Sequence, residues 1–154
     1  MAAAPGDFLA RARAWAATGL FLAGAIMIVG SALDWVTVER LPDVIPADQR
    51  DNAEPFNGFD VGDGYWTAAA GLVLMASAAS LVVRARHAWL GFFAAVVGGA
   101  IAISDYRGIE ALFEQTNAIG TGISPGIGLT LVAAGALLGL ISSVAGIAAT
   151  PKAA

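Results

Sequence analysis

The chain has 154 residues, of which 58% are hydrophobic and 13% charged, and its formal net charge is −4. This length and hydrophobicity allow one membrane domain and leave no room for a separate soluble catalytic domain. The chain has no cysteine and one histidine, which excludes disulfides, thiolate catalysis, cysteine zinc sites and bis-histidine haem.

Four stretches contain no Asp, Glu, Lys or Arg, namely residues 14–33, 64–83, 87–104 and 115–151. Because about 20 apolar residues cross the ~30 Å hydrocarbon core of a bilayer, each stretch can form one transmembrane helix. The sequence therefore predicts an all-α membrane protein, a bundle of four transmembrane helices. We expect a single membrane domain over 1–154, with helices at about 14–33, 65–83, 88–104 and 125–149.

The segments between these helices are sorted by charge. Five of the eight basic residues lie at the two termini and in the second connection, whereas eleven of the twelve acids lie in the loops 34–64 and 105–124. Since basic residues stay on the cytoplasmic side, we expect a multi-pass protein of the plasma membrane with cytoplasmic N- and C-termini and two acidic outer loops. The first apolar run is longer than the 7–15 residues of a signal peptide core, so we expect it to remain as helix 1.

The first outer loop has two segments with strand character. Residues 35–38 are β-branched and aromatic, and residues 54–61 show some alternation of apolar side chains. The residues between them are rich in Pro and Asp. This pattern predicts an outer loop or a short β-hairpin between helices 1 and 2.

A calcium site is one interpretation of Asn57, Asp60 and Asp63, whose side chains carry oxygen ligands. An EF-hand loop requires oxygen ligands at alternate positions and a closing Glu, whereas these residues are three apart. We interpret the segment as a turn with a helix cap, and we expect no metal site.

The second outer loop begins with an amphipathic segment, 106–116, in which Arg107, Glu110 and Glu114 share one face. It is expected either to cap the third helix or to lie on the outer membrane surface. Residues 117–124 are interpreted as a loop. Ser124 followed by Pro125 is typical of a helix start, so the fourth helix is expected to begin at Pro125.

Two features predict a partner-binding surface. Aromatic side chains flank the first outer loop, and aromatic residues are frequent among interface hot spots. In the third helix, small residues recur every four positions, which allows close helix packing either within the bundle or against a partner helix. The predicted contact residues are Trp35, Phe56, Phe59, Trp66, Gly91, Ala95 and Gly99. For the aromatic residues, the alternative is that they fold back onto the ends of the helices.

Three segments carry a resemblance to a known group of proteins: LDWVTV (33–38), GFDVGDGYWTAAAG (58–71) and GIGLTLVAAGALLGL (126–140). With these segments the chain resembles small four-span (tetraspan) membrane proteins of high-GC Gram-positive, actinobacterial-type bacteria, most of them of unknown function. Some of these proteins are accessory subunits of cell-envelope complexes, including respiratory supercomplexes and lipid-import machines. The resemblance implies a similar role for this chain.

No ionisable residue falls at a predicted bilayer centre, where proton and ion pathways usually need one. A serine nucleophile needs a base, and the single histidine, His87, lies on the opposite side from the acidic loops. We therefore expect no enzyme, no catalytic residue and no cofactor. The sequence favours a non-catalytic accessory or assembly subunit of a larger membrane complex, with other integral membrane subunits and membrane lipids as partners and no nucleic acid. The alternative is a stand-alone homo-oligomeric channel or small-solute carrier.

Overall fold

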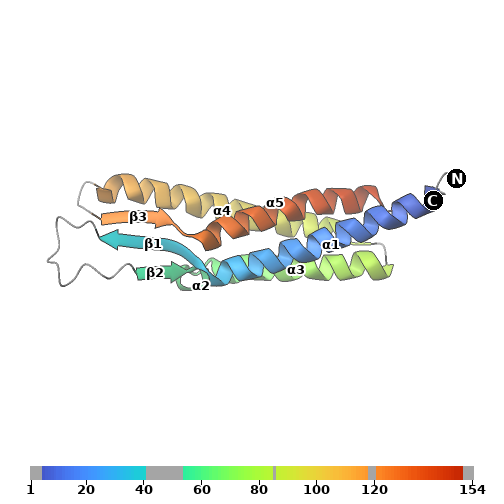
Figure 1. Cartoon of the computed structure of the whole chain (residues 1–154), viewed down its shortest axis with the longest axis horizontal. Helices are drawn as coiled ribbons and strands as arrows, with labels where there is room; N and C mark the ends of the chain where they lie inside the picture. The colour runs from blue at the N-terminus through green and yellow to red at the C-terminus, as the bar shows by residue number, and fades with distance from the viewer. Residues whose placement is uncertain (1–4, 41–53, 85, 118–120, 151–154) are drawn as a thin grey trace.

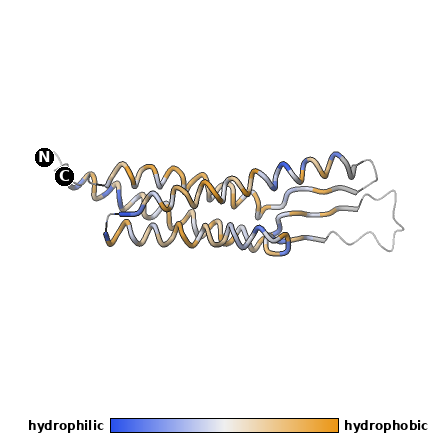
Figure 2. The backbone as a smooth tube through the Cα atoms, turned by 180° about the vertical axis from the view of Figure 1, so that it is seen from behind, coloured by the Kyte–Doolittle hydropathy of each residue, from blue (hydrophilic) through white to orange (hydrophobic). Residues whose placement is uncertain are grey.

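The computed structural model of the chain describes residues 5–40, 54–84, 86–117 and 121–150. Its longest elements are α1 (Pro5–Ala32), α3 (Gly64–Arg84), α4 (Ala88–Asn117) and α5 (Ile127–Ala148). All four helices are long and apolar enough to cross a membrane, as expected of a multi-pass membrane protein. Figure 2 shows their hydrophobic residues along the bundle and hydrophilic residues toward its ends. The predicted class, an all-α bundle of four membrane-spanning helices, is confirmed.

The four helices form an antiparallel bundle. α1 packs against α3 and α5, and α4 packs against the same two helices. α1 begins and α5 ends at one end of the bundle, which we call the terminal end (Figure 1). The connection between α3 and α4, with Arg84 and Arg86, also lies there. The opposite end carries the strands, and we call it the sheet end.

A three-stranded antiparallel sheet with the order β2-β1-β3 extends past the bundle at the sheet end (Figure 1). The strands are β1 (Asp34–Arg40), β2 (Glu54–Asn57) and β3 (Thr121–Pro125). The β1–β2 pair is the predicted hairpin between helices 1 and 2, and it is confirmed. The third strand was not expected, because its residues fall in a segment interpreted as a loop and in the expected first turn of helix 4.

The last turns of α4 cover one face of this sheet. Val36 of β1 and Ile123 of β3 pack against the buried core, to which Ile109 of α4 belongs. Thr37 is paired with Ser124, and both side chains belong to the other face of the sheet because neighbouring positions alternate. The segment 106–116 therefore belongs to α4, which continues past the expected end at 104 to Asn117, and its Ile109 is buried in the core beside the sheet.

The start of the fourth helix differs from the prediction. Ser124 and Pro125 belong to β3, where they pair with Thr37 and Val36 of β1. Gly126 continues this ladder by donating its backbone N–H to the carbonyl oxygen of Trp35 at 2.7 Å. Pairing with β1 thus holds the chain extended, and the helix begins at Ile127 with Gly126 as its N-cap.

Asn57 caps a short helix, α2 (Gly58–Val61), between the sheet and α3. Its side-chain oxygen accepts from the backbone N–H of Phe59 at 2.9 Å and of Asp60 at 3.1 Å. The Asp60 carboxylate accepts from the backbone N–H of Asn57 at 3.2 Å, which completes a capping box. The Asn57–Asp60 pair is thus used in a helix cap, in agreement with the interpretation made from the sequence.

Candidate interaction surface at the sheet end

Trp35 occupies the centre of the sheet end and has no exposed surface (0%). The register of β1 against β2 shifts between Asp34 and Val36, and the indole N–H donates to the carbonyl oxygen of Gly30 at 2.8 Å. Trp35 was predicted to contact a partner. In the structure the indole lies inside the chain's own core, which corresponds to the alternative that the aromatic residues fold back onto the helix ends.

Glycines on two other elements make room for this indole. A Cβ on Gly58 of α2 would lie 2.5 Å from Cε2 of Trp35, and a Cβ on Gly128 of α5 would lie 2.8 Å from its Cδ1. Both distances are shorter than the ~3.5 Å contact distance of two non-bonded carbon atoms, so a side chain at either glycine would clash with the indole. Trp35 therefore ties β1 to α1, α2 and α5, and it fixes how the sheet stands on the bundle.

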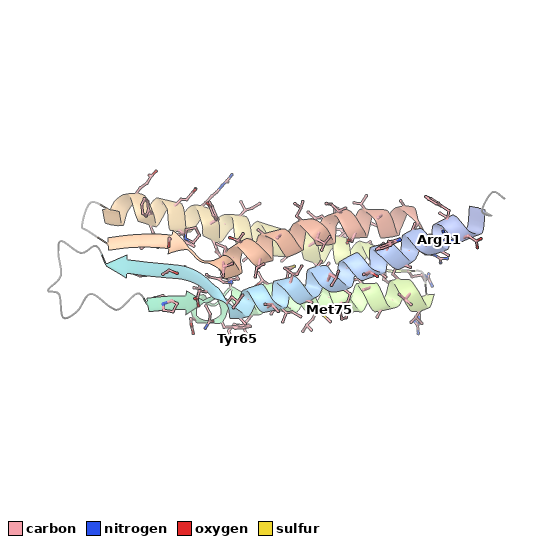
Figure 3. The ribbon with its side chains drawn as sticks, viewed as in Figure 1. Arg11, Tyr65 and Met75 are labelled. Atoms are coloured by element: carbon pink, nitrogen blue, oxygen red, sulfur yellow. The ribbon has the colours of Figure 1, made fainter. Side chains whose placement is uncertain are left out.

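The other predicted aromatic residues lie on or near the surface beside the sheet. Trp66 is 68% exposed and Phe56 is 40% exposed, whereas Phe59 is half-buried. The Phe59 ring lies 5.0 Å from the ring of Tyr65, measured between centroids. Figure 3 shows Tyr65 at the sheet end, and Arg11 marks the terminal end. Phe56 and Trp66 are thus accessible, and Phe59 is partly accessible.

The predicted small-residue surface of the third helix faces inward instead. A Cβ on Gly91 would lie 3.0 Å from atoms of both Leu20 in α1 and Ser143 in α5. Ala95 is fully buried, and a Cβ on Gly99 would meet only Ala136 of α5, at 3.5 Å. The stripe packs within the bundle, so Gly91 and Ala95 are not available to a partner. Larger side chains of α4 make up its exposed face.

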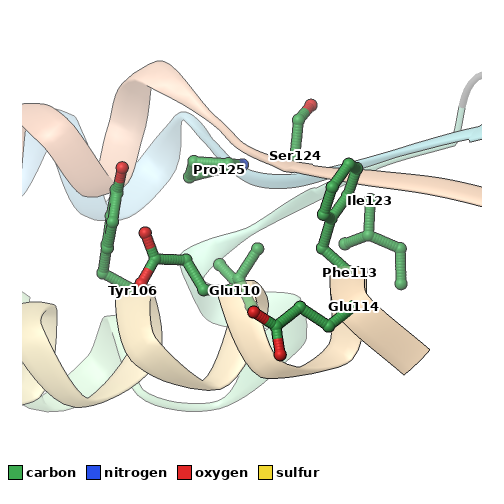
Figure 4. Close-up of a pocket in the computed structure, with 8 residues that line it drawn as sticks. Tyr106, Glu110, Phe113, Glu114, Ile123, Ser124 and Pro125 are labelled. Atoms are coloured by element: carbon green, nitrogen blue, oxygen red, sulfur yellow. The ribbon is translucent and has the colours of Figure 1, made fainter. Parts of the chain in front are cut away.

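A groove of about 470 Å³ runs between the last turns of α4 and strand β3 (Figure 4). Its lining is Tyr106, Ile109, Glu110, Phe113, Glu114, Ile123, Ser124 and Pro125. Figure 4 shows that Ile123 and Pro125 come from the strand, while Tyr106, Glu110 and Phe113 project from the helix. The groove therefore combines apolar walls with two carboxylates.

The charged residues in the lining of this groove are both acidic. The lining holds two glutamates and the hydroxyl of Tyr106, without a histidine or a basic side chain, and the Ser124 side chain points away from α4 (Figure 4). Carboxylates beside apolar walls attract a segment that carries both basic and apolar side chains. The sequence identified 106–116 as amphipathic but predicted no groove there, and it missed the strand that forms the other wall.

A second apolar groove, of about 530 Å³, lies between α1 and α3 toward the terminal end. Its walls include Phe21 and Met75, and Ala17 and Ala78 lie between them. Figure 3 shows Met75 on α3, along the side of the bundle. This groove carries no charged residue, so nothing in its lining distinguishes a lipid tail from a partner helix.

Asp63, just before α3, and Asp105 of α4 lie close enough to interact. One carboxylate oxygen of Asp105, Oδ2, is buried and has no hydrogen-bond partner. Within the described ranges, no group of three or more His, Cys, Asp or Glu residues is placed to hold a metal ion. The pair therefore lacks the ligands of a metal centre.

The buried polar side chains of the described bundle all carry hydroxyl groups. They are Ser31, Thr67, Ser77, Ser142 and Ser143. Ser31 donates to the carbonyl oxygen of Met27 at 2.8 Å, and Ser77 donates to that of Val73 at 2.8 Å. The hydroxyls of Ser31 and Ser77 thus bond to the preceding helical turn, which is a common way to satisfy a serine inside a membrane helix. The Ser143 hydroxyl is buried without a hydrogen-bond partner among the described residues.

Comparison with known proteins adds no assignment, because no known protein family and no curated protein matches this chain.

Proposed function

We propose that the chain is a non-catalytic accessory or assembly subunit of a larger cell-envelope membrane complex. The groove between α4 and β3 carries this proposal, because it presents apolar walls and two carboxylates on the part of the molecule that extends past the bundle. A helix bundle that served only as a membrane anchor would not need such a projection. The partner proposed for it is another integral membrane subunit with a basic and apolar segment next to the membrane.

The charges of the two ends support an orientation with cytoplasmic termini in the plasma membrane. Arg11, Arg13, Arg84 and Arg86 belong to the terminal end. The acids of the sheet end include Asp34, Asp60, Asp63, Asp105, Glu110 and Glu114, and Glu39 and Glu54 belong to strands β1 and β2 there. Under the positive-inside rule, the sheet and its groove then face the outside of the cell.

The resemblance to actinobacterial tetraspan proteins makes two hosts the first to test, a respiratory supercomplex and a lipid-import machine. Two of the buried hydroxyls favour a subunit over the channel or carrier alternative. Ser31 and Ser77 bond to their own helices, so they support packing more than a polar path.

The test is affinity purification of the tagged full chain in mild detergent, followed by mass spectrometry. We expect stoichiometric membrane subunits to be recovered with the chain. Glu114→Lys reverses a charge in the α4–β3 groove and should reduce their recovery about fivefold, the size of one exposed ion pair of about 1 kcal/mol. Trp66→Ala tests the exposed aromatic surface in the same way.

Arg86→Glu provides the matched control, since it reverses a charge at the terminal end, far from the groove. It should leave recovery unchanged. Recovery of the chain only as a homo-oligomer, without other subunits, would contradict the proposal and favour a channel or carrier.

A further inference from the structure

A third groove, of about 300 Å³, opens between α4 and α5 at the sheet end. Ala102, Leu129 and Ala133 belong to its apolar part, while Arg107 and Glu110 lie at its other end. Along α4 the lining extends from Ala102 to Glu110, about 12 Å at 1.5 Å per residue. It therefore leads from the charged last turns of α4 into the charge-free part of the bundle.

The two charges of this groove are not paired with each other. Arg107 and Glu110 are exposed and three residues apart on one helix, yet neither makes an ion pair within 4.0 Å in the part of the chain that the structure describes. Arg107 is the one basic residue in the lining of this groove. The groove thus offers one positive and one negative group beside an apolar channel.

We propose that this groove binds one phospholipid of the surrounding bilayer, with an ethanolamine headgroup. One acyl chain would lie along the exposed side chains of Ile103 and Ala133, over a floor formed by the buried Ala102 and Leu129. The phosphate would accept hydrogen bonds from the Arg107 guanidinium, whose planar array of donors suits phosphate oxygens. The headgroup ammonium would donate to the carboxylate of Glu110, which lines both this groove and the α4–β3 groove, so Glu114 would remain for the protein partner proposed above.

Three observations support this occupant. A volume of about 300 Å³ is at the lower limit of small-molecule pockets and suits part of an acyl chain. A partner helix, about 10 Å wide, is too large for this groove. Residues three apart on a helix have Cβ atoms ~5–6 Å apart, a separation that suits two headgroup charges joined by a two-carbon link. Glu110 disfavours a purely anionic headgroup, because it would repel a second negative charge.

The test reconstitutes the full chain into nanodiscs with equal amounts of phosphatidylethanolamine and phosphatidylglycerol of identical acyl chains. Native mass spectrometry then counts the lipids that stay bound. The wild-type chain should retain phosphatidylethanolamine about two- to fivefold over phosphatidylglycerol, the range of one exposed ion pair. Glu110→Gln should abolish this preference without reducing phosphatidylglycerol binding. Arg107→Gln should reduce retention of both lipids.

Ala133→Leu tests the apolar part, because the added side chain would fill the groove from its α5 wall. Ala133 is exposed, so the substitution should leave the bundle folded, which a thermal melt checks. It should reduce retention of both lipids, while Arg84→Gln at the terminal end should reduce neither. The proposal is overturned if Arg107→Gln and Ala133→Leu retain lipid like the wild type. It is also overturned if Ala133→Leu releases a protein subunit while lipid retention stays unchanged.

Discussion

The bundle and the sheet end differ in what fills the space between their elements. In the bundle, α1 and α3 come together at two facing glycines, and a Cβ on Gly71 would lie 2.7 Å from the carbonyl oxygen of Gly24. At the sheet end, the large side chain of Trp35 fills the interior. Since lipid tails are as apolar as side chains, helices in a bilayer gain from close packing, and small residues permit it. At the sheet end, outside the charge-free stretches, burial of a large aromatic side chain away from water stabilises the fold.

The strongest test of this difference is Trp35→Ala. It removes a fully buried side chain and its hydrogen bond to the Gly30 carbonyl oxygen, so we expect a loss of about 3–5 kcal/mol in the free energy of unfolding. Reversible unfolding in mixed micelles with increasing SDS measures this loss. Trp66→Ala is the matched control, because Trp66 is 68% exposed, and it should cost less than about 1 kcal/mol. Equal losses in the two variants would show that Trp35 does not hold the sheet end together.

The sequence predicted the bundle well because the bilayer imposes a simple rule on composition. Charge-free stretches marked all four helices, and the β-branched segment at Val36 marked the hairpin. The side of a helix that meets a neighbour is harder to predict. Gly91 and Ala95 lie on one face of α4, and all faces of this helix are apolar in its membrane-spanning part. Hydropathy alone therefore does not distinguish the face toward lipid from the face toward α5.

The sheet end was harder to predict, because its structure depends on contacts between distant residues. β3 is a strand because Ile123 and Ser124 pair with Val38 and Thr37 of β1, more than eighty positions earlier in the chain. Locally, Ser124-Pro125 is a good helix start, and pairing with β1 overrides that preference. Trp35 follows the end of α1 and is a typical interface aromatic in sequence. Its burial results from the register shift in β1 and from glycines on α2 and α5.

Within the bundle, Gly71→Ala tests the close approach of α1 and α3. The new Cβ would meet the Gly24 carbonyl oxygen and, at 2.9 Å, a side-chain carbon of Ile28, so the two helices must move apart. We expect a net loss of about 1–2 kcal/mol, since overpacking costs about 1–3 kcal/mol and alanine recovers up to about 1 kcal/mol of helix propensity. The SDS unfolding experiment measures it.

Gly108→Ala is the control for Gly71→Ala, because a Cβ on Gly108 of α4 would have no atom within 4 Å. It should leave stability unchanged or raise it by up to about 1 kcal/mol through helix propensity alone. A similar gain in Gly71→Ala would contradict close packing of α1 against α3.

The smallest expected effect concerns the hydrogen bond that joins α1 to α3 near the sheet end. The hydroxyl oxygens of Ser31 and Thr67 are 2.7 Å apart, and both residues are fully buried. Each hydroxyl has one proton, so when Ser31 donates to the Met27 carbonyl oxygen, Thr67 donates to Ser31.

Ser31→Ala, Thr67→Val and the double variant form a cycle that isolates this bond. Interhelical hydrogen bonds in membranes are worth about 0.6 kcal/mol on average, and we expect a coupling energy of that size, at most about 1.7 kcal/mol. The Trp35→Ala loss should therefore exceed it several-fold. A coupling energy as large as that loss would show that polar contacts stabilise the bundle as strongly as aromatic burial stabilises the sheet end.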